Sequence, residues 1–144
     1  MTVPELHETV EERLRRHRQR YTGVRRSLVD MLADADGPLA LPDILAVRSH
    51  PQSSVYRNLS VLESAGVVHR IVTHGEHARY ELAEDLSQHH HHLICASCGR
   101  VEDFVTPSKV ERAVEHAVGE AARNAGFQPR AHRIDMIGLC RDCS

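Results

Sequence analysis

Four cysteines form two Cys-x-x-Cys pairs, Cys95 with Cys98 and Cys140 with Cys143. Two intervening residues let both thiolates of a pair turn toward one point, and two such pairs complete a tetrahedral site of four sulfur ligands. The spacing predicts a closed structural zinc site. An iron–sulfur cluster is the remaining alternative, because disulfides need an oxidising compartment and a redox pair would not need a second pair.

A run of four histidines, residues 89–92, offers a second kind of metal ligand. In an extended segment successive side chains alternate between faces, so His90 and His92 point to one side and His89 and His91 to the other. One run can therefore supply two separate sites. Nitrogen and oxygen donors bind zinc, iron, manganese or nickel, and the alternative is a solvated histidine loop. Further potential ligands stand elsewhere in the chain: His69, Glu81, Glu111 and His132.

The composition is that of a globular chain. Its 144 residues are 41% hydrophobic and 26% charged, with a formal net charge of −2. No apolar run reaches the roughly 18 residues that a membrane helix needs, and the first 20 residues do not resemble a signal peptide. We therefore expect a cytoplasmic protein with no membrane partner. The aromatic content of 3% disfavours the stacking platforms of single-strand nucleic-acid binders.

Three short helices are expected in the first half of the chain. Apolar residues recur at spacings of three and four over residues 24–34, and a short helix follows at about 41–48. The third helix spans residues 51–66, with Ser49 or His50 as its cap. Tight breaks between short helices are typical of a helix-turn-helix.

A period of two then predicts a β-hairpin of residues 67–73 and 78–82, joined by residues 74–77. A hairpin directly after a helix-turn-helix makes a winged helix, whereas without a nucleic-acid role the same pattern would be a small α+β domain. The third helix carries polar groups that can read base edges: Gln52, Ser53, Ser54, Tyr56, Arg57 and Asn58. The alternative for Tyr56 is a half-buried core aromatic.

Charge is unevenly distributed, because residues 13–26 hold seven arginines and no acid. Taken alone, such a run predicts a solvated helical arm. Its position in front of the helix-turn-helix favours contacts with DNA phosphates, which weaken as salt rises.

The pattern of the second half of the chain predicts a compact α+β unit, which follows a polar hinge at residues 82–88. The long helix would be capped by Thr106, with Ser108 and Glu111 as a capping box, and would end at Gly126. Two strands, this helix and a last strand are expected over about residues 93–96, 100–105, 107–124 and 130–139.

Five segments, taken in order, resemble the ferric uptake regulator family of metal-responsive repressors. They are TGVRRSLVDML, SSVYRNLSVLESAGVV, RYEL, HHHHLICASCGRVEDF and a closing His-x₇-Cys-x-x-Cys. The resemblance implies an α+β protein, with an N-terminal winged helix-turn-helix domain over residues 1–83. A small α/β dimerisation domain with the Cys₄ zinc site would follow over residues 89–144. It also implies a homodimer that closes on an A·T-rich inverted repeat of double-stranded DNA when a second divalent metal binds.

The resemblance also implies a role for each candidate residue. The four cysteines would hold structural Zn²⁺, and Tyr56 and Arg57 would read the major groove while Arg20 enters the minor groove. The regulatory metal would be bound by His69, Glu81, His90 and His92. An accessory metal would be bound by His89, His91, Glu111 and His132.

The cognate metal depends on positions where family branches differ. The iron- and peroxide-sensing branches place a histidine where this chain has Pro38, whereas the zinc-sensing branch takes a ligand at the position of His69. Zinc sensors often have cysteine at Glu81, and Asp103 matches a carboxylate ligand of the peroxide-sensing branch. The sequence therefore favours Zn²⁺ as co-repressor, with Fe²⁺, Mn²⁺, Ni²⁺ or peroxide sensing as alternatives.

Two other classes of function compete with a repressor. A zinc hydrolase needs an open coordination position beside a carboxylate base, as in His-Glu-x-x-His, and the sequence contains no such motif. We therefore expect no enzymatic activity and no small-molecule substrate. A metal buffer could use the histidine run without binding DNA.

Overall fold

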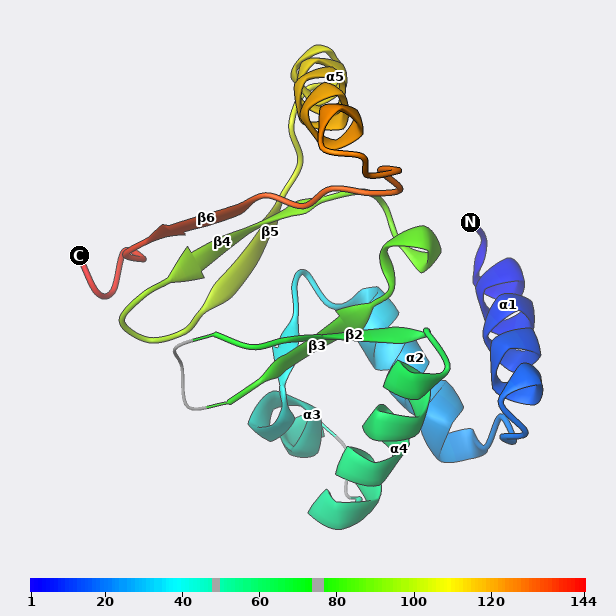
Figure 1. Ribbon diagram of the computed structural model, residues 1–144. Coiled ribbons are helices and arrows are strands. Elements are labelled where there is room, and N and C mark those ends of the chain that lie inside the picture. Colours follow the sequence, from blue (N-terminus) through cyan, green and yellow to red (C-terminus); the bar gives the residue numbers. More distant parts are fainter. Residues whose placement is uncertain (48–49, 74–76) are drawn as a thin grey trace.

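The computed structural model describes residues 1–47, 50–73 and 77–144 and arranges them in two modules (Figure 1). The first module contains α1 (Val3–Arg16), α2 (Gly23–Asp34), β1 (Leu39–Ala40), α3 (Leu41–Val47), α4 (Gln52–Ser64), β2 (Val68–Ile71) and β3 (Arg79–Leu82). A 3₁₀ turn, η1 (Glu84–Leu86), leads to the second module, which contains β4 (His91–Cys95), β5 (Val101–Phe104), α5 (Ser108–Asn124) and β6 (Asp135–Gly138). This arrangement confirms the α+β fold class.

The helix-turn-helix and its hairpin form as the sequence predicts. The strands β1, β3 and β2 make an antiparallel sheet in that order, with His69 of β2 opposite Glu81 of β3. The start of α4 differs from the expectation. Pro51 is the N-cap residue and no side chain makes a capping hydrogen bond, so the prediction that His50 caps this helix is wrong. Gly66 ends the helix region at a φ of +71°, which glycine adopts without a Cβ clash. The expected cap Ser49 and the connecting residues 74–76 lie outside the described residues.

The Arg-rich segment is partly a docked helix rather than a solvated arm. Leu6, Val10 and Leu14 of α1 are buried in the core of the first module. They step by four residues, so one apolar stripe of the helix packs into this core. The expectation of a solvated arm was drawn from residues 13–26 alone, and most of this apolar stripe lies before Arg13.

The residues expected to form a hinge are anchored to the first module. Leu86 of η1 is buried in the same apolar cluster as the helices. Arg13 of α1 donates a hydrogen bond to the carbonyl of Gly66 (2.6 Å) and pairs with Asp85 of η1. The connection between the modules is therefore a fixed turn up to about residue 86.

The second module is a three-stranded sheet in the order β5-β4-β6, with β4 antiparallel to β5 and parallel to β6. Figure 1 shows α5 on the side of this sheet that faces away from the first module. The last strand is shorter than expected and begins at Asp135, which lies opposite His92 of β4. Gly126 ends the α5 region at a φ of +82°, as expected.

The expected cap of α5 is wrong. Pro107 is the cap residue and makes no side-chain cap bond. The hydroxyl of Thr106 instead donates to the Glu111 carboxylate, and that carboxylate contacts histidines rather than the helix backbone. The same residues thus serve a polar cluster, which the sequence pattern of a capping box could not distinguish. Among the described residues no helix is both long enough and apolar enough to cross a membrane.

Candidate metal centres and nucleic-acid interface

The four cysteines converge where β4 ends and the chain leaves β6. Parallel pairing sets Cys95 opposite Gly138, so the turn carrying Cys98 meets residues 140–143. All four Sγ atoms lie within 4.8 Å of one another, and Cys98 Sγ is 3.8 Å from Cys140 Sγ. Hydrogen bonds from the backbone N–H groups of Cys98 and Cys140 lower the pKa of Cys95 to about 6. Four free thiols, one of them favouring the thiolate, fit a tetrahedral zinc ion.

A second cluster joins one residue of the first module to three of the second. Glu81 comes from β3, His92 and Asp103 are opposite each other on β4 and β5, and His90 directly precedes β4. Glu81 Oε2 lies 3.0 Å from the Nε2 atoms of both histidines. The same two nitrogens lie 3.8 Å from the Asp103 oxygens. Their ligand atoms lie within 4.8 Å of one another, so two nitrogens and two oxygens could bind one divalent ion.

Protons stabilise this second cluster when no ion is bound. Burial works against charging His92, but hydrogen bonding and charge attraction from Glu81 outweigh it and raise the pKa of the imidazole. The pKa of His90 is raised in the same way, against burial, by Gln88 and Glu81. Burial would raise the pKa of Glu81, but its hydrogen bonds to His92 and His90 lower it. A metal ion binding here would therefore have to displace protons from the two rings.

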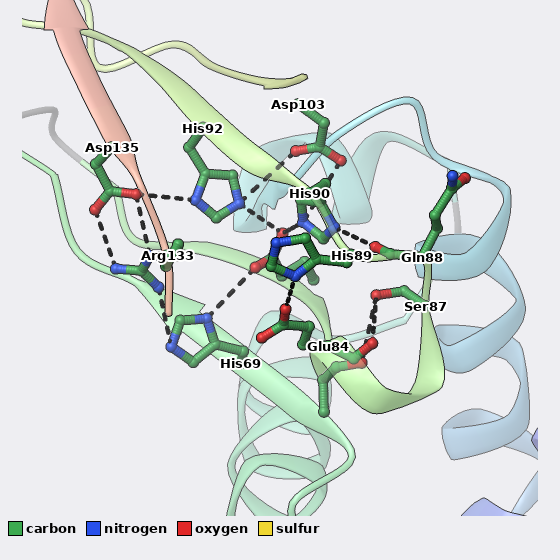
Figure 2. A network of polar contacts seen from close by, with 12 residues as sticks. His69, Glu84, Ser87, Gln88, His89, His90, His92, Asp103, Arg133 and Asp135 are labelled. Carbon is green, nitrogen blue, oxygen red and sulfur yellow. Dashed lines mark hydrogen bonds and ion pairs between the residues drawn. The ribbon is translucent and has the colours of Figure 1, made fainter. Parts of the chain in front are cut away.

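His69 lies beside this cluster but outside its four convergent ligand atoms. Its Nδ1 is 3.4 Å from Glu81 Oε1, and its Nε2 is 3.5 Å from the guanidinium of Arg133 (Figure 2). The structure thus brings Glu81, His90 and His92 together with Asp103. His69, in contrast, contacts Glu81 and a cation.

A third cluster forms on the opposite face of the histidine run, as alternation predicts. Glu111 of α5 is at its centre, with His91 Nε2 at 3.0 Å, His89 Nε2 at 2.9 Å and His132 Nε2 at 2.5 Å from its oxygens. The hydroxyl of Thr106 is the largest influence, followed by His91, and together they lower the pKa of Glu111 to about 2. Three imidazoles around one carboxylate can bind a second ion.

The candidate DNA-reading residues lie along one side of α4. Gln52, Ser53, Tyr56 and Arg57 are exposed, and Ser54 is half-buried. Tyr56 has 52% of its surface exposed, which disagrees with the alternative of a core aromatic. Arg20 is exposed in the loop between α1 and α2.

Sequence reasoning missed one contact beside this surface. Arg25 of α2 donates to the carbonyl of Arg20 (2.6 Å) and to Asn58 Oδ1 on α4 (2.9 Å). Arg25 therefore connects the loop of Arg20 to the reading helix, a role that differs from the expected phosphate contact. The spacing of 33 residues between Arg25 and Asn58 gave no local signal for this pairing.

Sequence reasoning also missed the residues that support the histidines. Asp135 Oδ1 is 3.2 Å from His92 Nδ1, the carbonyl of Gln88 is 2.7 Å from His90 Nδ1, and Glu84 contacts His89 Nδ1. Asp135 was detectable only as an acidic residue three positions after His132, because its contact depends on the register between β4 and β6.

The family model described as the ferric uptake regulator family matches residues 16–137. The ferric uptake regulation protein of Legionella pneumophila is 36% identical over 91 residues, which are 63% of this chain and 62% of that protein. The chain therefore aligns with less than two thirds of the length of this relative.

Two solved structures show the same architecture. The ferric uptake regulator of Helicobacter pylori, described with three functional metal-binding sites, superposes with a TM-score of 0.77 at 24% identity. That match covers 99% of this chain and 94% of the other, and it shows a shared fold. A zinc uptake regulator in complex with zinc and DNA is 25% identical, with a TM-score of 0.56 over 99% of this chain and 95% of the other.

Proposed function

Because this chain belongs to the ferric uptake regulator family, we propose that it is a metal-dependent repressor that binds DNA as a homodimer. Members of this family are regulators rather than enzymes. One observation carries the proposal: Glu81 of the wing sheet shares a cluster with His90, His92 and Asp103 of the second module. An ion bound there is held by both modules at once, so its binding depends on the angle between them.

The mechanism is a shift between two populations of the dimer. Glu81 reaches His90 and His92 only when the modules lie as in this structure, so the metal-loaded protein favours this arrangement. Only the difference in metal affinity between the closed and open arrangements can shift the population. We propose that the closed arrangement sets the two winged helices at the spacing of an A·T-rich inverted repeat. An ion at this site would act as a Lewis acid that accepts electron pairs from the four ligands, and the positions of those ligands would set its coordination geometry.

We propose zinc as the co-repressor, for metal-uptake genes. Glu81, His90, His92 and Asp103 make a four-ligand set, which suits the tetrahedral preference of zinc. The loop before α3 reaches this cluster at Gly37, where a Cβ would lie 3.8 Å from Asp103 Oδ1, so the loop offers no side-chain ligand at that point. The alternative is iron, manganese, nickel or peroxide sensing, and the second carboxylate, Asp103, favours it, since manganese prefers oxygen ligands.

The remaining sites complete the proposal. Cys95, Cys98, Cys140 and Cys143 would hold a structural zinc ion, and the Glu111 cluster an accessory ion. The second module presents unusually exposed apolar side chains on β6 and after it, with Met136, Ile137 and Leu139 at 58%, 62% and 59% exposure. Exposed apolar surface of this kind marks a protein interface, and we propose that it is buried in the homodimer.

On the DNA side, Tyr56 and Arg57 would contact bases in the major groove, a thymine methyl and a guanine or phosphate respectively. Gln52, Ser53 and Ser54 stand on the same helix and offer further donors, while Arg20 would enter the minor groove. If the protein were instead a metal buffer, these exposed residues would have no role.

Fluorescence anisotropy tests the proposal. Labelled duplex from upstream of this protein's own gene is titrated anaerobically at fixed salt, with buffered free Zn²⁺, Fe²⁺, Mn²⁺ or Ni²⁺. A mild chelator that spares the Cys₄ zinc provides the metal-free state. We expect zinc to restore tight binding at the lowest free concentration. Restoration by Fe²⁺ or Mn²⁺, abolished by peroxide, would instead support the alternative branches.

Variants of the reading helix provide the control. Arg57→Ala and Tyr56→Ala should lose operator binding, each by about 1–3 kcal/mol, and should keep the metal content of the parent protein. Unchanged DNA binding in both variants would contradict the proposed reading surface and favour a metal buffer.

A further inference from the structure

Five side chains form a closed ring of polar contacts around the proposed regulatory site. Arg133 precedes β6 and Asp135 begins it, and with His69 they are the members of the ring that lie outside the proposed ligand set. Figure 2 shows Asp135 between His92 and Arg133, with His69 on the other side of Arg133. Glu81 closes the ring by contacting both His69 and His92. The ring crosses between the modules twice, at Glu81–His92 and at His69–Arg133.

The contact of Asp135 determines which nitrogen of His92 faces the cluster. Asp135 Oδ1 lies 3.2 Å from His92 Nδ1, and a carboxylate can only accept a hydrogen bond. His92 Nδ1 therefore donates to Asp135, and Nε2, 3.0 Å from Glu81, is the nitrogen that faces the cluster and would exchange its proton for an ion. His90 is oriented in the same sense, because its Nδ1 donates to the carbonyl of Gln88 at 2.7 Å. A carboxylate behind a ligating histidine fixes the ring and increases its basicity.

Arg133 contacts the Nε2 atom of His69 and makes that nitrogen unavailable to an ion. A guanidinium can only donate, so His69 Nε2, 3.5 Å from Arg133 Nη1, is the acceptor. His69 Nδ1 then carries the proton and faces Glu81 Oε1 at 3.4 Å. Neither nitrogen of His69 has a free lone pair directed at the cluster. Arg133 is itself held by two contacts with Asp135, Nε to Oδ1 at 3.0 Å and Nη2 to Oδ2 at 3.1 Å.

We infer that Asp135 and Arg133 are positioning residues of the regulatory site: Asp135 fixes His92 with Nε2 toward the ion, and Arg133 keeps His69 from becoming a ligand. The inference rests on the proposed function only in taking Glu81, His90, His92 and Asp103 as a metal site. In this arrangement His69 supports Glu81 by a hydrogen bond. Arg133, which would not itself contact the ion, then sets the coordination number of the site by withholding His69.

The first test measures zinc affinity of the regulatory site by competition with a chromophoric chelator, without DNA, on protein that retains its Cys₄ zinc. Asp135→Ala should weaken zinc binding about 10- to 100-fold, and Asp135→Asn, which keeps an acceptor oxygen, should recover part of the loss. Asp30→Ala is the matched control, because Asp30 also faces a buried histidine, His7 at 2.9 Å, outside any metal cluster. This control should change zinc affinity by less than about twofold.

Nitrogen-15 NMR of the histidine rings provides a readout that a loss of packing would not move. In the zinc-loaded parent protein, His92 should be protonated at Nδ1 and bind through Nε2. In Asp135→Ala, measured at a pH high enough for the metal-free ring to be neutral, His92 should populate both tautomers, whereas the parent ring should keep its proton on Nδ1. Zinc affinity equal to that of the Asp30→Ala control, together with an unchanged His92 tautomer, would overturn the role of Asp135.

The second test asks whether Arg133 excludes His69. In the parent protein His69→Ala should lower zinc affinity by less than about tenfold, because only a supporting hydrogen bond to Glu81 is lost. In Arg133→Gln, Co²⁺ substituted at the site should show weaker d–d absorption, as expected when a fifth ligand joins a four-coordinate ion. Adding His69→Ala to Arg133→Gln should restore the stronger absorption.

Arg70→Gln is the control for the second test, because Arg70 neighbours His69 on β2 but pairs with Glu63 at 3.7 Å. Co²⁺ spectra that do not change on Arg133→Gln, or that change equally in Arg70→Gln, would overturn the role of Arg133. All of these measurements are made without DNA, so a protein that binds zinc as described but ignores DNA would refute the proposed function and leave this inference standing.

Discussion

Glu81 and Asp103 offer a direct comparison between a ligand that links the modules and one that does not. Both are carboxylates of the same four-residue cluster. Glu81 belongs to the wing sheet, whereas Asp103 shares the second module with His90 and His92. Replacing each with its amide, Glu81→Gln or Asp103→Asn, removes one charged ligand at nearly constant volume. The two variants therefore separate metal affinity from the transmission of metal binding to DNA.

The expected magnitudes differ sharply between the two variants. Allosteric coupling is typically 1–3 kcal/mol, which corresponds to about 5- to 150-fold in DNA affinity. In Glu81→Gln the amide oxygen is a much weaker ligand and the three stronger ligands are all on the second module, so saturation with metal should change DNA affinity by less than about twofold. In Asp103→Asn more metal is needed, but at saturation the parent protein's full enhancement should return, because Glu81 still connects the modules.

The assay is anisotropy with operator DNA at fixed salt, with each variant first brought to metal saturation as judged by a chelator competition. Retention of the parent enhancement by saturated Glu81→Gln would refute the role of Glu81 as the ligand that links the two modules. Equal loss of enhancement in both variants would refute it too, since the modular origin of the ligand would then be irrelevant.

Three further predictions concern stability and protons. Leu59 is fully buried in the core of the first module. Leu59→Ala should therefore lower the free energy of unfolding by about 2–5 kcal/mol, and urea unfolding should show this loss while the Cys₄ zinc content stays constant. Zinc binding at the second cluster should release protons, because, despite burial, hydrogen bonds and charge attraction raise the pKa values of His90 and His92 and so favour the protonated rings. Zinc affinity should therefore fall as the pH is lowered. Calorimetry in buffers of different ionisation enthalpy that shows no proton release would contradict the assignment. Cys143→Ser should lower the Cys₄ zinc content and loosen the second module, seen as faster hydrogen exchange in β4 and β6, whereas exchange in α4 should be unaffected.

The sequence allowed much of the fold to be predicted where one local pattern dominated. The apolar steps of α2 and α4 and the alternation of β2 and β3 are local signals, and the structure places these elements within a few residues of the prediction. The docked helix α1 was predicted poorly, because the identity of its buried stripe depends on what it packs against. The cap of α5 failed for a related reason: Glu111 has the spacing of a capping residue, but three histidines from other segments attract its carboxylate.

For the candidate sites, too, local patterns were predictable from the sequence and tertiary contacts were not. Alternation along residues 89–92 correctly predicted that His90 and His92 join one cluster and His89 and His91 another, since it depends only on a short extended segment that leads into β4. Which partners each pair meets depends on strand register and on contacts between modules. His69 and Glu81 are opposite each other on β2 and β3, which the hairpin itself suggests. The contact of His69 with Arg133, 64 residues away, and that of His92 with Asp135 exist only in the tertiary structure.

In the proposed mechanism, metal binding and DNA binding favour the same arrangement of the two modules. The most direct measurement is the affinity of the Glu81 cluster for the activating metal, with and without saturating operator DNA, at one pH and salt concentration. Linkage requires the two effects to be equal, so DNA should tighten metal binding by the same factor, about 5- to 150-fold, by which metal tightens DNA binding. A metal affinity that DNA leaves unchanged would contradict the claim.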